Sequence, residues 1–148
     1  MTVVLIDTSI FLNVLDVPGR NQQRLAVLQE LQLRLEADDE LLLPIAAIIE
    51  TGNHIGHVPD GRLRRQTAER FVTEVQKALD GMAPWVPARP ITIDDIADWL
   101  EGFPDHAMRE RGLGDVSIIA EWERQRLLSP QRRIEIWSLD VHLQGFAA

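Results

Sequence analysis

The sequence has no cysteine among its 148 residues. Disulfides, thiolate metal sites and cysteine nucleophiles are therefore excluded, and any metal ligand must be an oxygen or an imidazole nitrogen. A long hydrophobic run is also missing, because the longest apolar stretch of interest, 41–49, falls far short of the roughly 20 residues that a transmembrane helix needs. The N-terminus has neither a basic leader nor a signal-peptide core, since Asp7 follows only a few apolar residues. We expect a cytoplasmic protein with no membrane span.

Lysine is almost absent, because Lys77 is the only one among 15 basic residues, and the formal net charge is −8. This charge argues against a passive nucleic-acid coat, since lysine and arginine normally supply most of the non-specific affinity for phosphates. A nuclease is not excluded. The remaining basic residues are arginines, whose planar guanidinium suits bidentate phosphate contacts.

The length and a hydrophobic content of 45% fit one globular domain, 1–148, with a real core. Residues 3–6 form a continuous apolar run without alternation, which is typical of a strand buried on both faces of a parallel sheet. Residues 41–43 and 134–139 predict further strands. The proline-rich stretch 84–90 predicts at most a short edge strand, or else a loop.

Helical patterns fill the stretches between these strands. They cover 8–15, 20–36, a stretch that begins at Pro44, a stretch that Asp60-Gly61 opens and Gly81 stops, 92–100 and a last stretch that begins at Asp115. The residues expected to face the core are Leu25, Leu28, Leu31 and Leu35, then Phe71, Val72, Val75 and Leu79, and finally Val116, Ile119 and Leu127. Residues 102–112 predict a solvated insertion, or alternatively a substrate or partner loop. Alternating strands and helices predict an α/β fold whose parallel sheet has helices on both faces.

Four acidic residues occupy one edge of the expected sheet or lie beside it. Asp7 follows the first strand, Asp140 follows the last, Glu50 lies in the helix after the second, and Asp115 heads its own helix. Ligands bind beyond the carboxyl ends of strands in open parallel sheets. Carboxylates gathered there repel one another unless a cation compensates them, and oxygen ligands of this kind favour Mg²⁺ or Mn²⁺ over Zn²⁺.

Each acid also has a simpler explanation when it is considered alone. Asp7 and Asp115 fit the N-cap positions of their helices, and Asp140 fits a turn. Glu50 is harder to explain, because an acid that follows two isoleucines on an apolar helix is rarely buried unpaired. The functional interpretation depends on the joint pattern, since unrelated accidents seldom bring several acids to one edge.

The motifs around these acids resemble the PIN-domain nuclease family, which includes the toxin ribonucleases of bacterial toxin-antitoxin pairs. The resemblance covers nearly the whole chain in the expected order, and each motif is weak by itself. It rests on Leu5-Ile6-Asp7-Thr8-Ser9-Ile10-Phe11-Leu12, on Pro44-Ile45-Ala46-Ala47-Ile48-Ile49-Glu50, on Gly114-Asp115-Val116-Ser117-Ile118-Ile119-Ala120 and on Trp137-Ser138-Leu139-Asp140. The chain departs from the family at Glu121-Trp122, where small residues are usual, so packing or an extra acidic contact there is expected to differ.

The resemblance implies a three-layer α/β/α sandwich with a mostly parallel sheet, and a metal-dependent endoribonuclease that leaves a 5′-phosphate and a 3′-hydroxyl. Asp7, Glu50 and Asp115 would hold a first Mg²⁺ or Mn²⁺ ion, and Asp140 would complete or support a second position. Hydrogen bonds from Thr8, Ser9 and Ser138 would hold the carboxylates or waters, although capping also explains the first two. The resemblance further implies a homodimer and an antitoxin partner.

Other interpretations remain open at this point. Glu50, His54 and His57 share one helical face and could bind zinc, but Gly56 and Pro59 indicate that the helix ends there and that the histidines are exposed. Phosphotransfer enzymes also use an aspartate after a strand, yet the residue two positions on is a serine and the only lysine lies in a mid-chain helix. The main rival is a protein that keeps the nuclease fold and acts only by binding a partner.

Overall fold

The computed structural model describes residues 1–147, which form an α/β fold around one four-stranded sheet. The strands are β1 (Thr2–Ile6), β2 (Glu40–Leu43), β3 (Trp85–Pro87) and β4 (Arg133–Trp137). All of them are parallel, in the order β3-β2-β1-β4. The predicted parallel α/β fold is confirmed, and the proline-rich stretch supplies the edge strand β3.

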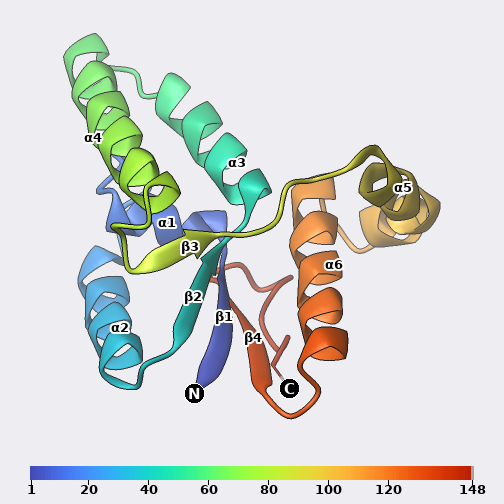
Figure 1. The fold of residues 1–148 in the computed structure, drawn as a ribbon. Helices are drawn as coiled ribbons and strands as arrows, with labels where there is room; N and C mark the ends of the chain where they lie inside the picture. The colour runs from blue at the N-terminus through green and yellow to red at the C-terminus, as the bar shows by residue number, and fades with distance from the viewer. Residues whose placement is uncertain (148) are drawn as a thin grey trace.

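Helices cover both faces of the sheet (Figure 1), as a three-layer sandwich requires. They are α1 (Thr8–Val14), α2 (Arg24–Glu36), α3 (Ile45–Gly56), α4 (Gly61–Leu79), α5 (Ile93–Met108) and α6 (Leu113–Leu128). The first four lie on one side, whereas α6 lies on the other with α5 packed against it. Within residues 1–147, no helix is both long and apolar enough to cross a membrane.

Strand β1 lies at the centre because its side chains alternate between two cores. Val4 and Ile6 belong to the core under α1 to α4, whereas Val3 and Leu5 belong to the core under α6. All of these side chains are at most 2% exposed. A strand that is apolar on both faces is buried on both faces only when helices cover each side of the sheet. This packing fixes the position of the carboxyl end of β1.

Several residues that the periodicity placed in the core are instead exposed. Leu25, Leu35, Val72, Leu79 and Leu127 face solvent, and these predictions are wrong. The buried sector of α2 is centred on Val27, and that of α4 contains Thr67 and Ala78. Helices α2 and α4 each have more apolar residues than their contact with the core covers. Helical spacing alone therefore does not identify which of these residues are buried.

Helix α5 is longer than the sequence suggested. Thr92 caps it as predicted, through a hydrogen bond from the backbone N–H of Asp95, but the helix continues past Leu100 to Met108. Most of the expected insertion 102–112 is therefore helical, and only a short turn separates α5 from α6. Pro104 lies inside the helix, where it lacks an N–H to donate.

Candidate active site

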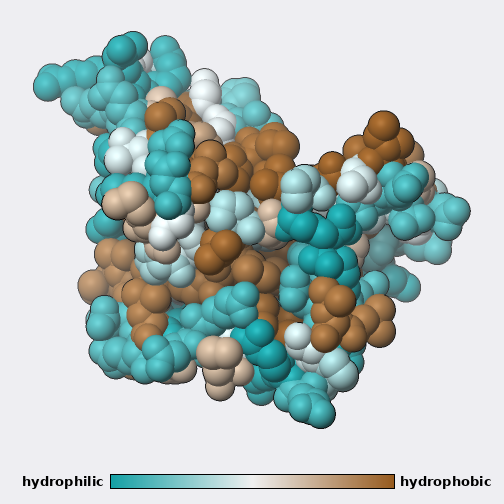
Figure 2. Space-filling model, viewed as in Figure 1, coloured by the Kyte–Doolittle hydropathy of each residue, from teal (hydrophilic) through white to brown (hydrophobic). Residues whose placement is uncertain are grey.

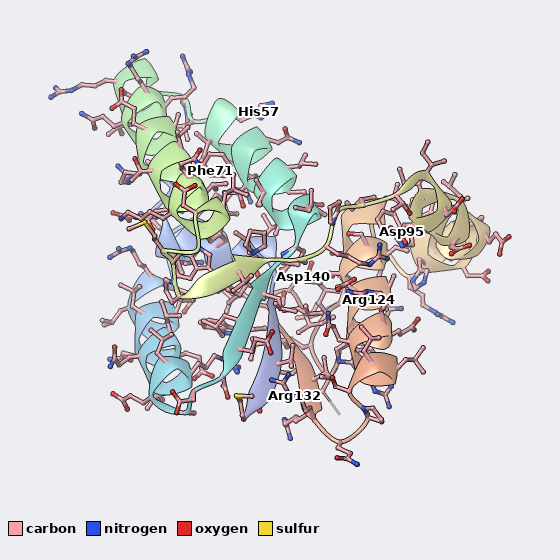
Figure 3. All side chains as sticks on the ribbon, viewed as in Figure 1. His57, Phe71, Asp95, Arg124, Arg132 and Asp140 are labelled. Atoms are coloured by element: carbon pink, nitrogen blue, oxygen red, sulfur yellow. The ribbon has the colours of Figure 1, made fainter. Side chains whose placement is uncertain are left out.

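The carboxyl edge of the sheet gathers the four predicted acids between α3 and α6. Asp7 follows β1 directly and caps α1, Glu50 lies in the middle of α3, and Asp115 is the third residue of α6. Asp140 lies three residues beyond β4, because that strand ends at Trp137 rather than at Leu139 as expected. Figure 3 labels Asp140 at this edge.

Asp7 is held by two serine hydroxyls from opposite ends of the chain. Its Oδ2 accepts hydrogen bonds from Ser9 Oγ at 2.8 Å and from Ser138 Oγ at 2.7 Å. Each hydroxyl in turn accepts a backbone N–H at 2.9 Å, from Leu139 for Ser9 and from Asp140 for Ser138. Because the carboxylate of Asp7 can only accept, both hydroxyls direct their hydrogens at it. The weaker bond from Ser9 N, at 3.4 Å, is the capping contact.

Glu50 is oriented by Thr8 and by the backbone of Gly114. The Thr8 hydroxyl donates to Glu50 Oε2 at 2.8 Å. On the other side, a Cβ added to Gly114 would lie 1.7 Å from Glu50 Oε1, so this carboxylate rests against the start of α6. The contact also places Glu50 next to Asp115, the residue that follows Gly114.

Asp115 and Asp140 are each tied to a nearby backbone N–H. Asp115 Oδ2 accepts from Gly112 N at 3.1 Å, which is the half of a capping box that the third helical residue supplies. Asp140 Oδ1 accepts from His142 N at 2.9 Å, which makes the turn that the simpler explanation predicted. The predicted N-cap role of Asp115 is wrong, because Gly112 is the N-cap of α6 and Asp115 is the third helical residue, whereas the predicted turn at Asp140 is confirmed. Each of these contacts uses only one carboxylate oxygen.

Each of the four carboxylates has one oxygen in a hydrogen bond and one oxygen without a hydrogen bond from the described residues. One oxygen of each is held by a hydrogen bond: Oδ2 of Asp7, Oε2 of Glu50, Oδ2 of Asp115 and Oδ1 of Asp140. The other oxygen accepts no hydrogen bond from the described residues. This leaves four oriented carboxylates, each with one oxygen available to a ligand.

The electrostatics show that the acids act on one another. Burial raises the pKa of Glu50, the Thr8 hydrogen bond opposes this change, and the charge of Asp7 adds to it. Burial also raises the pKa of Asp115; the Gly112 N–H opposes this, and the charges of Asp140, Asp7 and Glu50 raise it further. The four side chains therefore share one strongly negative region.

No protein cation neutralises that region in the part of the chain that the structure describes. None of the ion pairs found there includes one of the four acids. As they stand, residues 1–147 also contain no set of three or more histidine, aspartate or glutamate side chains arranged to hold one ion. The acids are near enough to repel one another, and binding of a shared ion would have to draw them closer.

The donor set fits a hard divalent cation. Carboxylate oxygens are the ligands that Mg²⁺ and Mn²⁺ prefer, and positive charge would relieve the repulsion that raises the pKa of Glu50 and Asp115. Zinc is a weaker fit. His57 Nδ1 lies 2.7 Å from the backbone oxygen of Asn53 at the end of α3, and no histidine belongs to a metal-ligating group within residues 1–147.

We predict that Glu50→Gln raises stability at neutral pH when a chelator is present. The folded pKa of Glu50 lies above its ordinary value of 4.5, so between these values the folded protein holds more protons than the unfolded chain. Stability is therefore lost as pH rises through that window. The urea midpoint of the variant should be higher than that of the wild type at neutral pH. The difference between the two midpoints should disappear near pH 4.5. A gap that does not depend on pH, or that the exposed variant Glu36→Gln reproduces, would contradict the shift.

Glu121 and Trp122, where the chain departs from the family motif, do not join the site. Glu121 pairs with Arg89 at 3.6 Å and with Arg124 at 3.0 Å. Trp122 is buried against β4, and its Nε1 donates to the backbone oxygen of Ile134 at 3.0 Å. The expected extra acid is thus neutralised by arginines, and the tryptophan fills the core under α6.

Two features of the site were not recognised in the sequence. The sequence placed Gly114 in a motif without giving it a role, yet its missing side chain is what lets Glu50 lie against α6. The turn after β4 is anchored by Leu143, which is fully buried, and by Phe146, whose backbone oxygen accepts from Ile136 N. The glycine directly before Asp115 was a signal for the first feature, whereas nothing in the last nine residues indicated the second.

Three comparisons of the chain, with protein-family models, with curated proteins and with solved structures, found no match.

Proposed function

We propose that this protein is a divalent-metal-dependent endoribonuclease of the PIN type, which hydrolyses RNA phosphodiester bonds. One observation carries the proposal: four carboxylates from four segments each have one oxygen fixed by a hydrogen bond and the other free, with no protein cation beside them in the described chain. A structural role would use such oxygens in ion pairs, because uncompensated clustered charge destabilises the fold.

In this proposal, Asp7, Glu50 and Asp115 hold a first Mg²⁺ or Mn²⁺ ion, and Asp140 completes or supports a second position. The ion supplies positive charge at the scissile phosphate and makes water easier to ionise. Ser9 and Ser138 fix the rotation of Asp7, and Thr8 fixes that of Glu50. These hydroxyls fix the orientation of the two carboxylates before an ion binds, which lowers the reorganisation that catalysis requires.

The test is cleavage of an end-labelled single-stranded RNA of mixed sequence by the purified chain. We expect products with a 5′-phosphate and a 3′-hydroxyl when Mg²⁺ or Mn²⁺ is present, and none with a chelator. A contaminating metal-independent ribonuclease would leave cyclic or 3′-phosphate ends and would ignore the chelator. If Asp115→Asn cleaves as fast as the wild type, the proposal is wrong.

A second function, partner binding without turnover, is favoured by one observation. The acids are not yet arranged to hold an ion as they stand. Calorimetric titration with Mn²⁺ separates the two functions, because a nuclease must take up the ion whereas a pure binding protein need not. Uptake that Asp7→Asn abolishes supports the nuclease.

We further predict that Ser138→Ala lowers cleavage and Mn²⁺ affinity about tenfold to a hundredfold, the range found when a group that orients a metal ligand is removed. The variant loses both the donor to Asp7 and the acceptor for Asp140 N. Ser129→Ala, at the end of α6, is the matched control and should leave cleavage unchanged. Equal activity in the two variants would remove Ser138 from the site.

The same proposal includes the partners that the PIN resemblance implies: an RNA substrate, a cognate antitoxin protein and a second copy in a homodimer, in the cytoplasm. Co-purification of the chain with the product of a small neighbouring gene would support the toxin role. Cleavage by the chain alone tests the enzyme separately.

A further inference from the structure

Helix α5 has three distinct faces, which follow from its 3.6-residue period. One face packs on α6 through half-buried residues: Asp95, Trp99, Gly102 and His106. A second face is acidic and consists of Asp94, Glu101 and Asp105, with Asp98 at its border with α6. The third face is apolar and points away from α6: Ile93, Ile96, Ala97, Leu100 and Met108. We call the second and third faces together the α5 outer surface.

The apolar face of the α5 outer surface is unusually open. Ile93 and Met108 are each 85% exposed, and Leu100 is 54% exposed, while no residue of α5 is buried. Figure 2 shows this apolar surface beside hydrophilic surface at the arm where Figure 1 places α5. A row of large apolar side chains at helical spacing, left uncovered, is typical of a contact surface for another molecule.

The acidic face decides which kind of molecule fits. Its carboxylates make no ion pair with the described residues. The paired acid of α5 is Asp95 on the α6-facing side, which Arg89 contacts at 2.6 Å. Four unpaired acids beside the apolar row repel RNA phosphates and anionic lipid headgroups. A second copy fits poorly through this helix, because each chain carries −8 and pairing two α5 helices brings two acidic rows to one contact.

We propose that the α5 outer surface is a docking site for a basic amphipathic segment of another protein. The segment places apolar side chains at i, i+3 or i+4, and i+7 on the row from Ile93 to Leu100. Its arginines or lysines lie against the acidic face. The partner segment would bind as a helix that lies along α5. Burial of apolar side chains would give the affinity, and the opposite charges would fix the orientation of the segment. The proposal does not depend on the nuclease activity of the acidic site.

The probe is a synthetic labelled helical peptide with leucines on one face and lysines on the adjacent face, titrated with the full chain and followed by fluorescence anisotropy. Leu100→Ser should weaken binding about tenfold or more, since burial of one leucine corresponds to roughly that factor. Asp98→Asn combined with Asp105→Asn should also weaken binding and reduce its salt dependence. Leu33→Ser, on α2, is the matched control, because Leu33 is 61% exposed against 54% for Leu100, and it should bind as the wild type does.

Several outcomes would overturn the proposal: no peptide binding, equal binding by Leu100→Ser and the wild type, or equal binding of a peptide whose lysines are replaced by glutamate. Sedimentation is the second readout. A dimer that Leu100→Ser dissociates would assign the surface to a second copy instead. Because Leu100 lies outside the acidic site, its variant should keep the wild-type cleavage rate, so a failure here is separable from a failure of the nuclease proposal.

Discussion

Asp7→Asn is expected to abolish Mn²⁺ uptake and to lower RNA cleavage about a hundredfold to a thousandfold, the equivalent of several kcal/mol of charge stabilisation. The reason is the fixed direction of two hydroxyl hydrogens. Ser9 and Ser138 each donate to Oδ2 of Asp7, a carboxylate oxygen that can only accept, and each also accepts a backbone N–H. In the variant, only the amide oxygen can accept them. The NH₂ group is then turned into the acidic site, where it is a donor in place of a ligand.

Folding of this variant should not suffer, because the substitution keeps both hydroxyl bonds and removes one of the charges that raise the pKa of Glu50 and Asp115. Calorimetry with Mn²⁺, single-turnover cleavage and a thermal melt are the three measurements. Asp105→Asn, which removes one charge from exposed α5, is the control and should cleave normally. Full Mn²⁺ binding by Asp7→Asn would exclude Asp7 as a ligand.

The fold could be predicted because its strongest signals are local. The unbroken apolar run of β1 requires cover on both faces, and this requirement alone implies a parallel sheet between two helical layers. The errors lie where two local signals compete. Val72 and Val75 both fit a helical stripe, and only the packing of α4 on α3 leaves Val72 exposed while Val75 contacts the core. The predicted helix 92–100 was too short, because Gly102 and Pro104 are poor helix formers and nothing local shows that α5 packs on α6, which supports the extra turns.

The site was predictable as a set of residues but not as a geometry. The positions of Asp7 and Glu50 relative to their strands predicted a shared edge. That Glu50 rests on α6 follows from how α3 and α6 pack across the end of the sheet, a contact between segments that no sequence spacing encodes. Ser138 is a similar case, since its partner Asp7 lies 131 residues away in the chain. Hydrogen bonds over such separations depend on strand order, with β4 next to β1.

Gly114→Ala should lower cleavage about tenfold to a hundredfold while the protein stays folded. The new Cβ would lie 1.7 Å from Glu50 Oε1 and 2.7 Å from its Cδ, so the Glu50 side chain must rotate and lose its bond from Thr8. The atoms that clash belong to the end of a flexible side chain rather than to backbone. The fold can therefore absorb the change, and alanine is itself favoured over glycine within a helix by about 1 kcal/mol.

A double-mutant cycle with Glu50→Gln distinguishes displacement of Glu50 from a general disturbance of α6. If Gly114 acts through Glu50, adding Gly114→Ala to Glu50→Gln should cost little further activity, because residues that act as a unit are not additive. Gly56→Ala, where a Cβ meets nothing within 4 Å, is the matched control and should cleave as the wild type does. Full additivity of the two changes, or wild-type activity of Gly114→Ala, would show that the placement of Glu50 against α6 has no part in the chemistry.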